Sequence, residues 1–346
     1  MKILCATTET TNTYNYDINN AIKKEYSNCA IELGIENFWS RSGDYNIIHI
    51  HWPEALFNWK KNVDETDLKG LINCLEYWKK KSRIIITRHN LVPHIHNNNT
   101  YEKIFEIVFN YADTVVHLGN YSVKEFMEHY PKIQTHHVVI PHPVYANYPN
   151  YISRKEARKK LGIPDKKFVI VIFGSIRNME EKKIILDSFR KVKIKHKILL
   201  ANRWLYYSER RKRWREYVQY YFSQKYYIKS KEVSEDEIQI YLNASDIVFV
   251  PRINVLNSAI PLLAFTFGKT TIGPFFGSIG EILIETGNPV FDPSNISSII
   301  DAILQAKRLT EKGKGEENRE YAIQNWNLEL IAKKHFELYT LVLSEK

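Results

Sequence analysis

Short apolar runs alternate along the chain with amphipathic segments, and this alternation predicts buried strands separated by helices. The clearest run, residues 247–250, is rich in β-branched and aromatic residues and stops at Pro251, as a buried parallel strand does. Residues 66–81 repeat apolar side chains at close to 3.6 positions, which predicts an amphipathic helix. By the same criteria we expect strands at 2–6, 45–52, 83–87, 113–118, 136–141, 168–173, 197–201, 270–272 and 287–291, and helices at 17–26, 101–112, 122–130, 154–161, 234–244, 259–267, 294–309 and 326–343. Residues 312–317 are expected to form a polar loop.

Residues 246–281 combine a strand, a polar turn, a helix, a second strand and a glycine-rich loop. The turn ends in Asn257 and Ser258, the helix is expected over 259–267, and the loop ends on Glu281. In an open α/β sheet, ligands bind beyond the carboxyl ends of the strands. The free N–H groups at a helix N-terminus favour a phosphate there. The segment therefore indicates a nucleotide site, and an ordinary β-α-β unit with an N-cap serine is the alternative.

The length of 346 residues suggests two or three domains, and a hydrophobic content of 44% suffices for full cores. No run approaches the roughly 18 apolar residues of a membrane span. After Lys2, the apolar run 3–6 is too short for a secretory signal, so we expect a cytoplasmic protein. The cysteines, Cys5, Cys29 and Cys74, are unclustered and are expected to be reduced core residues.

Basic residues outnumber acidic ones by 49 to 39, which gives a formal net charge of +10. Such an excess suits phosphate-bearing ligands, anionic lipid surfaces or nucleic acid. The most basic stretch, residues 203–231, interleaves aromatic side chains with cations, among them Arg210, Arg211, Lys212, Arg213 and Arg215. Two interpretations stay open, a solvated helix with its aromatic face on a sheet and peripheral contact with an anionic membrane. Nucleic acid is not an expected partner, because no nucleic-acid motif accompanies the stretch.

Several motifs, in their order along the chain, resemble glycosyltransferases of the GT-B fold, of the family 4 type found in bacterial polysaccharide and capsule synthesis. Segment 246–281 carries most of them, at Pro251, Asn257, Ser258, Gly268, Lys269, Gly277 and Glu281. The resemblance implies an α/β fold of two Rossmann-like domains facing a cleft, with a C-terminal helix that crosses back to the N-terminal domain. It implies an acceptor-binding domain at 1–145, a nucleotide-sugar-binding domain at 146–325 and a terminal helix at 326–346. The family's E-x7-E pair has no counterpart, since 255–264 contain no glutamate, and the anomeric outcome stays open.

The resemblance assigns donor binding to the second domain. Residues 174–177, G-S-I-R, resemble the turn in which an arginine and a lysine hold the donor diphosphate. The family's Lys-Gly pair falls on the glutamates 180–181, and the adjacent Lys182 and Lys183 are the expected substitutes. The expected donor-binding residues are Arg177, Lys182, Lys183, Pro251, Asn257, Ser258 and Glu281.

Histidines mark the ends of two expected strands in the first domain. The strand at 45–52 ends in H-x-H-W-P, where His49 and His51 share one face, and the strand at 83–87 runs into His89. Both phrases resemble elements on the acceptor side of these enzymes, although a structural histidine is the alternative for each strand. The resemblance implies His89 and Glu54 as catalytic residues, and Glu9, Asn12, Tyr14, His51 and His94 as acceptor-side residues.

The implied reaction transfers a glycosyl group from a UDP- or GDP-sugar to a hydroxyl of a glycan or of a lipid diphosphate-linked glycan. No cofactor and no metal are expected, because protein cations and helix N-termini would neutralise the leaving diphosphate. If the reaction inverts the anomeric centre, Glu54, Glu9 or His89 must take the acceptor's proton. His89, His94 and His96 lack the spacing of a zinc site. A non-catalytic sugar- or nucleotide-binding protein and a GT-B epimerase are the alternatives, because the E-x7-E pair is missing.

Overall fold

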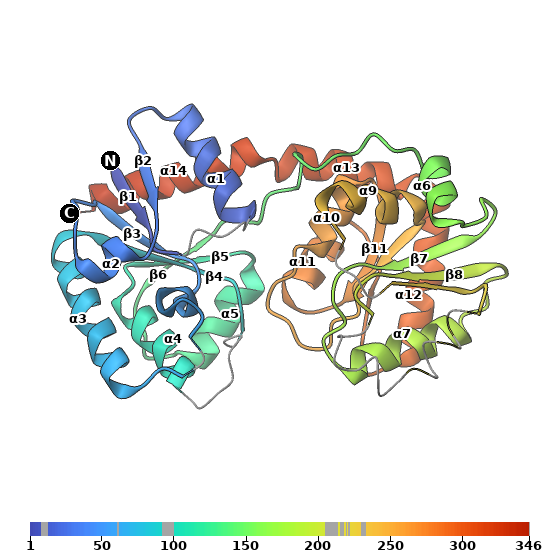
Figure 1. Ribbon diagram of the computed structural model, residues 1–346, viewed down its shortest axis with the longest axis horizontal. Coiled ribbons are helices and arrows are strands. Elements are labelled where there is room, and N and C mark those ends of the chain that lie inside the picture. The colour runs from blue at the N-terminus through green and yellow to red at the C-terminus, as the bar shows by residue number, and fades with distance from the viewer. Residues whose placement is uncertain are drawn as a thin grey trace. The chain divides into compact units, whose positions relative to one another are not determined.

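The chain folds into two compact units, each built around its own six-stranded sheet (Figure 1). The computed structural model describes residues 1–7, 13–60, 62–91, 100–204, 214, 218, 220, 222–229 and 233–345. Unit 1 comprises Met1–Pro143 and Trp326–Lys346, and unit 2 comprises Val144–Asn325. All strand pairs of both sheets are parallel. The expected α/β class, with two Rossmann-like units and a terminal helix that belongs to the first, is confirmed.

Unit 1 has the strand order β2-β1-β3-β4-β5-β6. Its strands are β1 (Lys2–Cys5), β2 (Ala30–Leu33), β3 (Ile47–Ile50), β4 (Arg83–Arg88), β5 (Thr114–His117) and β6 (His136–Val139). Its helices are α1 (Thr13–Glu25), α2 (Glu36–Ser40), the 3-10 helix η1 (Pro53–Phe57), α3 (Glu65–Lys81), α4 (Thr100–Tyr111), α5 (Asn120–His129) and α14 (Leu328–Ser344). Helix α3 packs beside α4, and α1 packs beside α14, so that two helical layers enclose the sheet.

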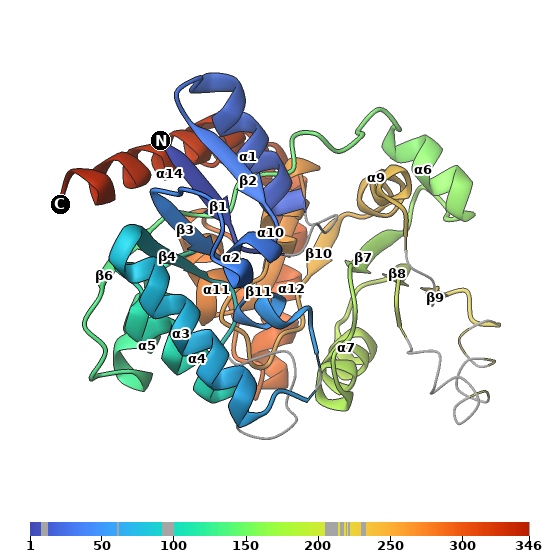
Figure 2. The ribbon, with the colours of Figure 1, turned by 60° about the vertical axis from the view of Figure 1, so that its left-hand side comes forward.

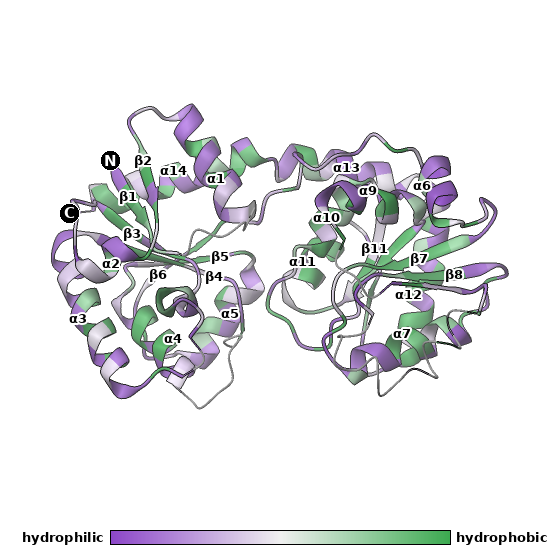
Figure 3. Ribbon diagram, in the orientation of Figure 1, coloured by the Kyte–Doolittle hydropathy of each residue, from purple (hydrophilic) through white to green (hydrophobic). Residues whose placement is uncertain are grey.

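Successive residues of the strands in unit 1 face two separate cores, as the period of two in a strand requires. Ile48 and Ile50 of β3 lie in the core that includes α3 and α4. Ile47 lies in the other core, with residues of α1 and α14. A parallel sheet covered on both faces consists of nearly continuous apolar runs. Figure 3 accordingly shows hydrophobic strands and helices whose outer faces are polar.

Unit 2 has the strand order β12-β11-β10-β7-β8-β9. Its strands are β7 (Phe168–Ile172), β8 (Lys197–Ala201), β9 (Tyr226–Ile228), β10 (Ile247–Phe249), β11 (Thr270–Pro274) and β12 (Val290–Phe291). Its helices are α6 (Arg154–Leu161), α7 (Met179–Lys191), α9 (Glu235–Ala244), α10 (Ile260–Thr266), α11 (Gly277–Glu285), α12 (Ile296–Glu311) and α13 (Lys314–Asn325). Helices α6 and α9 cover one face of the sheet, and α7 and α12 cover the other (Figures 1 and 2). The chain leaves β7 toward β8 on one side and returns to β10 on the other, so the strand order reverses between β7 and β10.

Local capping fixes the ends of α6, which has the bounds expected from the sequence. Ser153 Oγ accepts a hydrogen bond from the Glu156 N–H, and the Glu156 carboxylate accepts one from the Ser153 N–H. Gly162 ends the helix with φ of +68°, a backbone conformation that glycine adopts without steric cost. These signals act within a few residues, which is why the sequence pattern locates the helix correctly.

Two expected loops in unit 2 are helical instead. Glu281 does not end the glycine loop but lies within α11, which begins at Gly277. The expected polar loop at 312–317 is largely occupied by α13. A Cβ added at Gly315 would lie 2.1 Å from the carbonyl oxygen of Gly268, so this glycine lets α13 approach the end of α10 closely. A tertiary contact, which the local polar pattern does not reveal, accounts for the helix.

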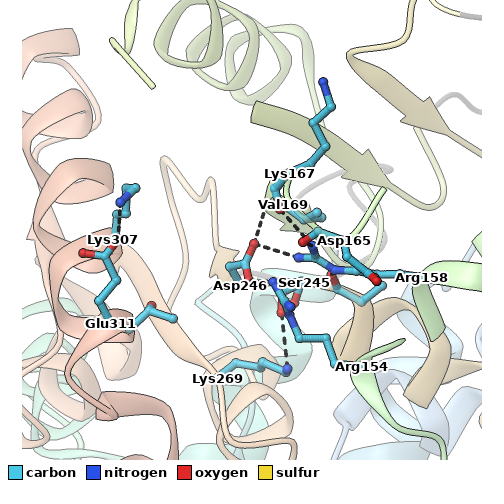
Figure 4. Close-up of polar contacts among 12 residues, drawn as sticks. Arg154, Arg158, Asp165, Lys167, Val169, Ser245, Asp246, Lys269, Lys307 and Glu311 are labelled. Carbon is cyan, nitrogen blue, oxygen red and sulfur yellow. Dashed lines mark hydrogen bonds and ion pairs between the residues drawn. The ribbon is translucent and has the colours of Figure 1, made fainter. Parts of the chain in front are cut away.

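A buried ionic network ties the amino ends of β7 and β10 to α6 (Figure 4). The Asp246 carboxylate accepts hydrogen bonds from Arg154 Nη2 at 2.9 Å, Arg158 Nη2 at 2.9 Å and the Val169 N–H at 2.7 Å. The Arg158 side chain is 0% exposed and also donates to the Ala244 carbonyl oxygen. Lys269, one of the residues that carry the family resemblance, lies in this network, and burial lowers its pKa to about 8. The network lies at the opposite end of the sheet from the carboxyl ends of the strands, which indicates a structural role.

The three cysteines are free and buried, as expected for reduced core residues. Within the described part of the chain, no helix combines the length and the apolar character needed to cross a membrane.

Candidate functional site

The carboxyl ends of β7 and β10 form the point of strand reversal in unit 2, where open α/β sheets bind ligands. Gly174 follows β7 with φ of +89°, a left-handed conformation that only glycine adopts readily. Its N–H donates to Asn202 Oδ1 at 2.9 Å, and Asn202 lies directly after β8. The backbone of the turn is therefore fixed from the neighbouring strand.

Arg177 lies in this turn with its side chain exposed. Its backbone N–H donates to Glu181 Oε2 at 2.8 Å. Asn178 caps α7, since its Oδ1 accepts from the Glu181 N–H at 2.8 Å. The turn thus presents an arginine beside a helix N-terminus, an arrangement that suits a phosphate group.

The two expected substitutes for the family lysine have different surroundings. Lys182 is buried, and its Nζ lies 5.5 Å from the centre of the Trp204 ring. Lys183 is exposed and pairs with Asp187 one helical turn further along α7, at 3.0 Å. Lys182 faces the interior next to the turn, whereas Lys183 lies on the outer face of the helix.

The turn at 251–258 packs directly against the start of α11. Gly277 has φ of +67°, and a Cβ added there would lie 2.6 Å from the Val255 carbonyl oxygen. The Ser278 N–H donates to the Leu256 carbonyl oxygen at 2.9 Å. Glycine is therefore required at 277 to bring the two motifs of the resemblance together.

The remaining expected donor-binding residues lie on or beside these two segments. Pro251 is buried directly after β10, and Asn257 and Ser258 are partly exposed in the turn. Ser258 Oγ accepts from the Ile260 N–H at 3.4 Å, at the start of α10, which has only seven residues. Glu281 is partly exposed in α11.

The segment in which the family carries its glutamate pair, residues 255–264, contains no acidic side chain in this chain. Val255 and Leu263 are both buried, and each belongs to the hydrophobic interior of unit 2. No carboxylate from residues 255–264 is available to bond a ribose. Any ribose contact must come from other residues.

In unit 1, two of the expected site histidines, His51 and His89, lie together at the carboxyl ends of β3 and β4. His51 Nδ1 and His89 Nε2 are 3.2 Å apart, within hydrogen-bond distance. Trp52 stacks on the His89 ring with 4.2 Å between ring centres and 17° between the planes. The Tyr14 ring makes edge contacts with both imidazoles. His89 is partly exposed, whereas His51 and Tyr14 are buried.

A second set of hydrogen bonds, centred on His49, lies next to His51 in the interior of unit 1. His49 Nδ1 is 2.8 Å from the Tyr339 hydroxyl of α14, and His49 Nε2 is 2.8 Å from Thr87 Oγ1. The His49 and His51 rings stack with 4.1 Å between their centres. Burial holds the pKa of both histidines well below the ordinary value, so both are neutral at neutral pH. His49 and His51 lie on the same face of β3, but His49 is bonded to buried partners, whereas His51 lies beside the partly exposed His89.

Glu54 lies in η1 and is 0% exposed. Burial raises the pKa of Tyr101 to about 12, and the nearby Glu54 adds to this shift. In this structure the carboxylate lies in the interior of unit 1 and has no exposed surface. Glu9, Asn12 and His94, the other expected residues of this half, lie outside the described residues.

No group of three or more histidine, cysteine or acidic side chains positioned to hold a metal occurs among the described residues. Arg252, which follows Pro251 and contacts the β7–α7 turn, was not among the predicted site residues. A basic residue directly after a predicted buried strand was the available signal. Trp52, the stacking partner of His89, was not predicted either, because partners across strands depend on the register of the sheet.

No family model matches the sequence, and no curated protein matches it. A sucrose-phosphate synthase from Thermosynechococcus elongatus is similar in structure, with a TM-score of 0.75 and 13% identity over 100% of this chain and 99% of that chain. Anabaena HepE, solved in complex with UDP-glucose, has a TM-score of 0.72 and 12% identity over 100% of both chains. A putative UDP-N-acetylglucosamine 2-epimerase from Listeria monocytogenes has a TM-score of 0.60 and 12% identity, over 97% of this chain and 94% of that chain. The chain has the GT-B fold.

Proposed function

We propose that the protein is a glycosyltransferase that moves a sugar from a nucleotide diphosphate sugar to a hydroxyl of a glycan acceptor. The observation that carries this proposal is the point of strand reversal in unit 2, between β7 and β10. The turn with Arg177 follows β7 there, and the turn at 251–258, which packs on Gly277, follows β10. The likeness to HepE, which was solved with UDP-glucose, extends over the whole chain and supports the same choice.

In this proposal unit 2 binds the donor. Arg177 and the N–H groups at the start of α7 would take the diphosphate, with Lys182 and Lys183 adding positive charge. Pro251, Asn257 and Ser258 would form the adjoining turn, and Glu281 would bond sugar or ribose hydroxyls. The reaction proposed here requires no bound metal, because these protein groups neutralise the leaving diphosphate.

In unit 1, His89 is our choice for the group that contacts the reacting sugar and takes the acceptor's proton. It is partly exposed, and its hydrogen bond to the neutral His51 fixes the orientation of the ring. Glu54 is the weaker candidate, because it is fully buried. Tyr14 contacts the same two rings and would shape the acceptor side.

A GT-B epimerase or a non-catalytic binding protein is the second candidate. The absence of any glutamate from residues 255–264 favours it, and the Listeria epimerase has a similar fold. A thermal-shift screen against UDP, GDP, CDP and dTDP would first identify the nucleotide, because a ligand that binds the folded state raises the melting temperature. Release of that nucleoside diphosphate from its sugar conjugate would then separate a transferase, which hydrolyses its donor slowly without acceptor, from a binding protein. Stabilisation by none of the four would contradict the proposal.

Replacing Arg177 by alanine should weaken nucleoside diphosphate binding by roughly 1.5–3 kcal/mol, the range for a hydrogen bond to a charged group. The physical reason is that the exposed guanidinium lies at the turn beyond β7 and beside the start of α7. Calorimetric titration with the nucleotide found in the screen provides the measurement. Arg190→Ala, an exposed arginine in the last turn of the same helix, is the matched control and should bind as the wild type does. Equal affinity of Arg177→Ala and Arg190→Ala would remove Arg177 from the donor site.

The acceptor we propose is a glycan carried on a lipid diphosphate in bacterial surface polysaccharide synthesis, met at the inner face of the cell membrane. The net charge of +10 and the basic stretch at 203–231 support contact with an anionic surface. Within that stretch, the described Trp214 and Phe222 are 59% and 79% exposed. Exposed aromatic and basic side chains together favour the membrane interface. Arg210, Arg211, Lys212, Arg213 and Arg215 lie outside the described residues.

The protein should bind anionic vesicles at low salt and dissociate from them at high salt. Each Lys or Arg near such a surface contributes about 1 kcal/mol within a Debye length, and salt shortens that length. Vesicle flotation with phosphatidylserine or phosphatidylcholine measures this. Replacing Arg210, Arg211 and Arg213 together by glutamate should abolish binding. The same charge change at the exposed Lys191, Lys193 and Lys195 is the control and should preserve most of it. Equal flotation of the wild type with neutral and anionic vesicles at low salt would leave the stretch as a solvated helix.

A further inference from the structure

Arg252 lies two residues beyond Val250, at the carboxyl end of β10, and only 5% of it is exposed. Its side chain reaches across the point of strand reversal to the turn that follows β7. Nη1 donates to the Ser175 carbonyl oxygen at 3.1 Å and to Glu181 Oε2 at 2.8 Å. The guanidinium therefore lies against the turn that carries Arg177.

Glu181 is the counter-ion of this arginine and is itself buried. It is 1% exposed, in the first turn of α7. Its Oε2 accepts from both Arg252 Nη1 and the Arg177 N–H, each at 2.8 Å. A carboxylate at this position would repel a phosphate unless its charge were already neutralised, and Arg252 supplies that neutralisation.

The ion pair leaves part of the guanidinium unused. An arginine has five N–H donors, and the contacts with Glu181 and Ser175 both use Nη1. Among the described residues, no acceptor lies within hydrogen-bond distance of the buried Nε. Burying a donor without a partner costs about 1–3 kcal/mol, so such a group calls for a specific explanation.

Other cations lie at the same turn. Arg203 Nη1 is 3.5 Å from Ser175 Oγ, and the buried Lys182 follows Glu181 directly. Together with Arg177 and Arg252, these make four cationic side chains, three of which follow the strands β7, β8 and β10 and one of which lies in α7. Such a set suits an anion with several oxygens and more than one negative charge.

We propose that Arg252 is a diphosphate-binding residue of the donor site and that Glu181 is the positioning residue that holds it against the Arg177 turn. This inference rests on the proposed function for the identity of the ligand as a nucleotide sugar. The prediction that Arg252 binds an anion rests only on the positions of Arg252 and Glu181. The unused Nε edge of Arg252 donates to a phosphate oxygen, and Glu181 keeps the guanidinium in place before the ligand arrives. The Nε–H group of Arg252 is already removed from water in the protein. Its hydrogen bond to a phosphate oxygen therefore does not have to displace a bound water.

Inorganic pyrophosphate and UDP, titrated calorimetrically into the full chain, test this. Arg252→Gln should weaken pyrophosphate binding by roughly tenfold to hundredfold, the equivalent of one charged hydrogen bond. Arg252→Lys should recover part of the loss, because it restores the charge but not the planar fork. Arg319→Gln is the matched control and should bind as the wild type does, because Arg319 is a partly exposed arginine paired with Glu316 on α13.

Arg252→Gln leaves Glu181 buried without its counter-ion and is therefore at risk of not folding. The double variant Arg252→Gln, Glu181→Gln removes both charges and leaves two neutral, polar side chains at these positions. It should fold and still bind pyrophosphate at least tenfold more weakly than the wild type. Pyrophosphate affinity of the double variant within twofold of the wild type would overturn the inference, as would a wild type that does not bind pyrophosphate. A wild type that binds pyrophosphate but no nucleoside diphosphate would overturn the proposed function and leave the Arg252 result intact.

Discussion

Replacing His89 by alanine should lower turnover by about a hundredfold or more, the scale of a lost general acid–base group. Nucleotide affinity should remain nearly unchanged, because the proposed donor-binding residues all belong to unit 2 and His89 belongs to unit 1. The stack on Trp52 and the hydrogen bond to His51 Nδ1 at 3.2 Å help to hold the ring in place, as does the edge contact with Tyr14. Since burial keeps His51 neutral, the bond joins one donating and one accepting ring nitrogen, and a single orientation of His89 is favoured.

The measurement is steady-state release of the nucleoside diphosphate from its sugar conjugate, combined with calorimetry on the same variant. His136→Ala is the matched control, because His136 is exposed at the start of β6 and contacts none of these rings through a described interaction. Its turnover should equal that of the wild type. If His89→Ala retains turnover within a few-fold of the wild type, His89 is a structural residue and the proton acceptor must be sought elsewhere in unit 1.

Asp246→Asn should destabilise the protein by about 3–5 kcal/mol, the cost of removing one partner from a buried ion pair. The carboxylate neutralises Arg158, whose side chain is 0% exposed, and it also accepts from Arg154 and from the Val169 N–H. Asparagine keeps the size of the side chain but provides one acceptor oxygen in place of two and no charge. Urea unfolding followed by tryptophan fluorescence measures the difference.

A matched control for this variant lies in the same unit. Glu311→Gln removes the charge that pairs with Lys307 one turn away on α12, and the Glu311 side chain is 60% exposed (Figure 4). An exposed pair of this kind contributes only about 0.3–0.5 kcal/mol. Equal unfolding midpoints for Asp246→Asn and Glu311→Gln would show that the network at the amino ends of β7 and β10 is dispensable for stability.

The sequence predicts most of the elements because their signals are local. Strand β8 and helix α6 have the expected bounds, and the capping box of Ser153 and Glu156 lies within four residues of chain. The alternation in residues 47–50 also predicts that His49 and His51 face the same way. Predictions fail where a distant contact decides the structure, as at Gly315, whose close approach to Gly268 allows a helix in a polar stretch.

The sequence predicts which strand ends carry the residues of the candidate site, but it does not predict which of these residues contact one another. Parallel strands bring their carboxyl ends to one edge, so the sequence places Arg177 and the 251–258 turn at the same edge of one sheet. It does not show that Glu54 is fully buried, because burial depends on how η1 packs on the interior of unit 1. The contacts of each of these residues are decided by the fold and not by the surrounding sequence.

By itself, then, the sequence determined the α/β class, the capped helices and the strand ends that carry polar side chains, because these depend on periodicity and on interactions between residues a few positions apart. Only the tertiary structure decided which side chains meet. Arg252 and Glu181 are 71 residues apart and His51 and His89 are 38 residues apart. Their contacts exist because β10 lies beside β7 and β3 beside β4. Strand order and register are set by the packing of the whole sheet, and no stretch of sequence around any one of these residues contains that information.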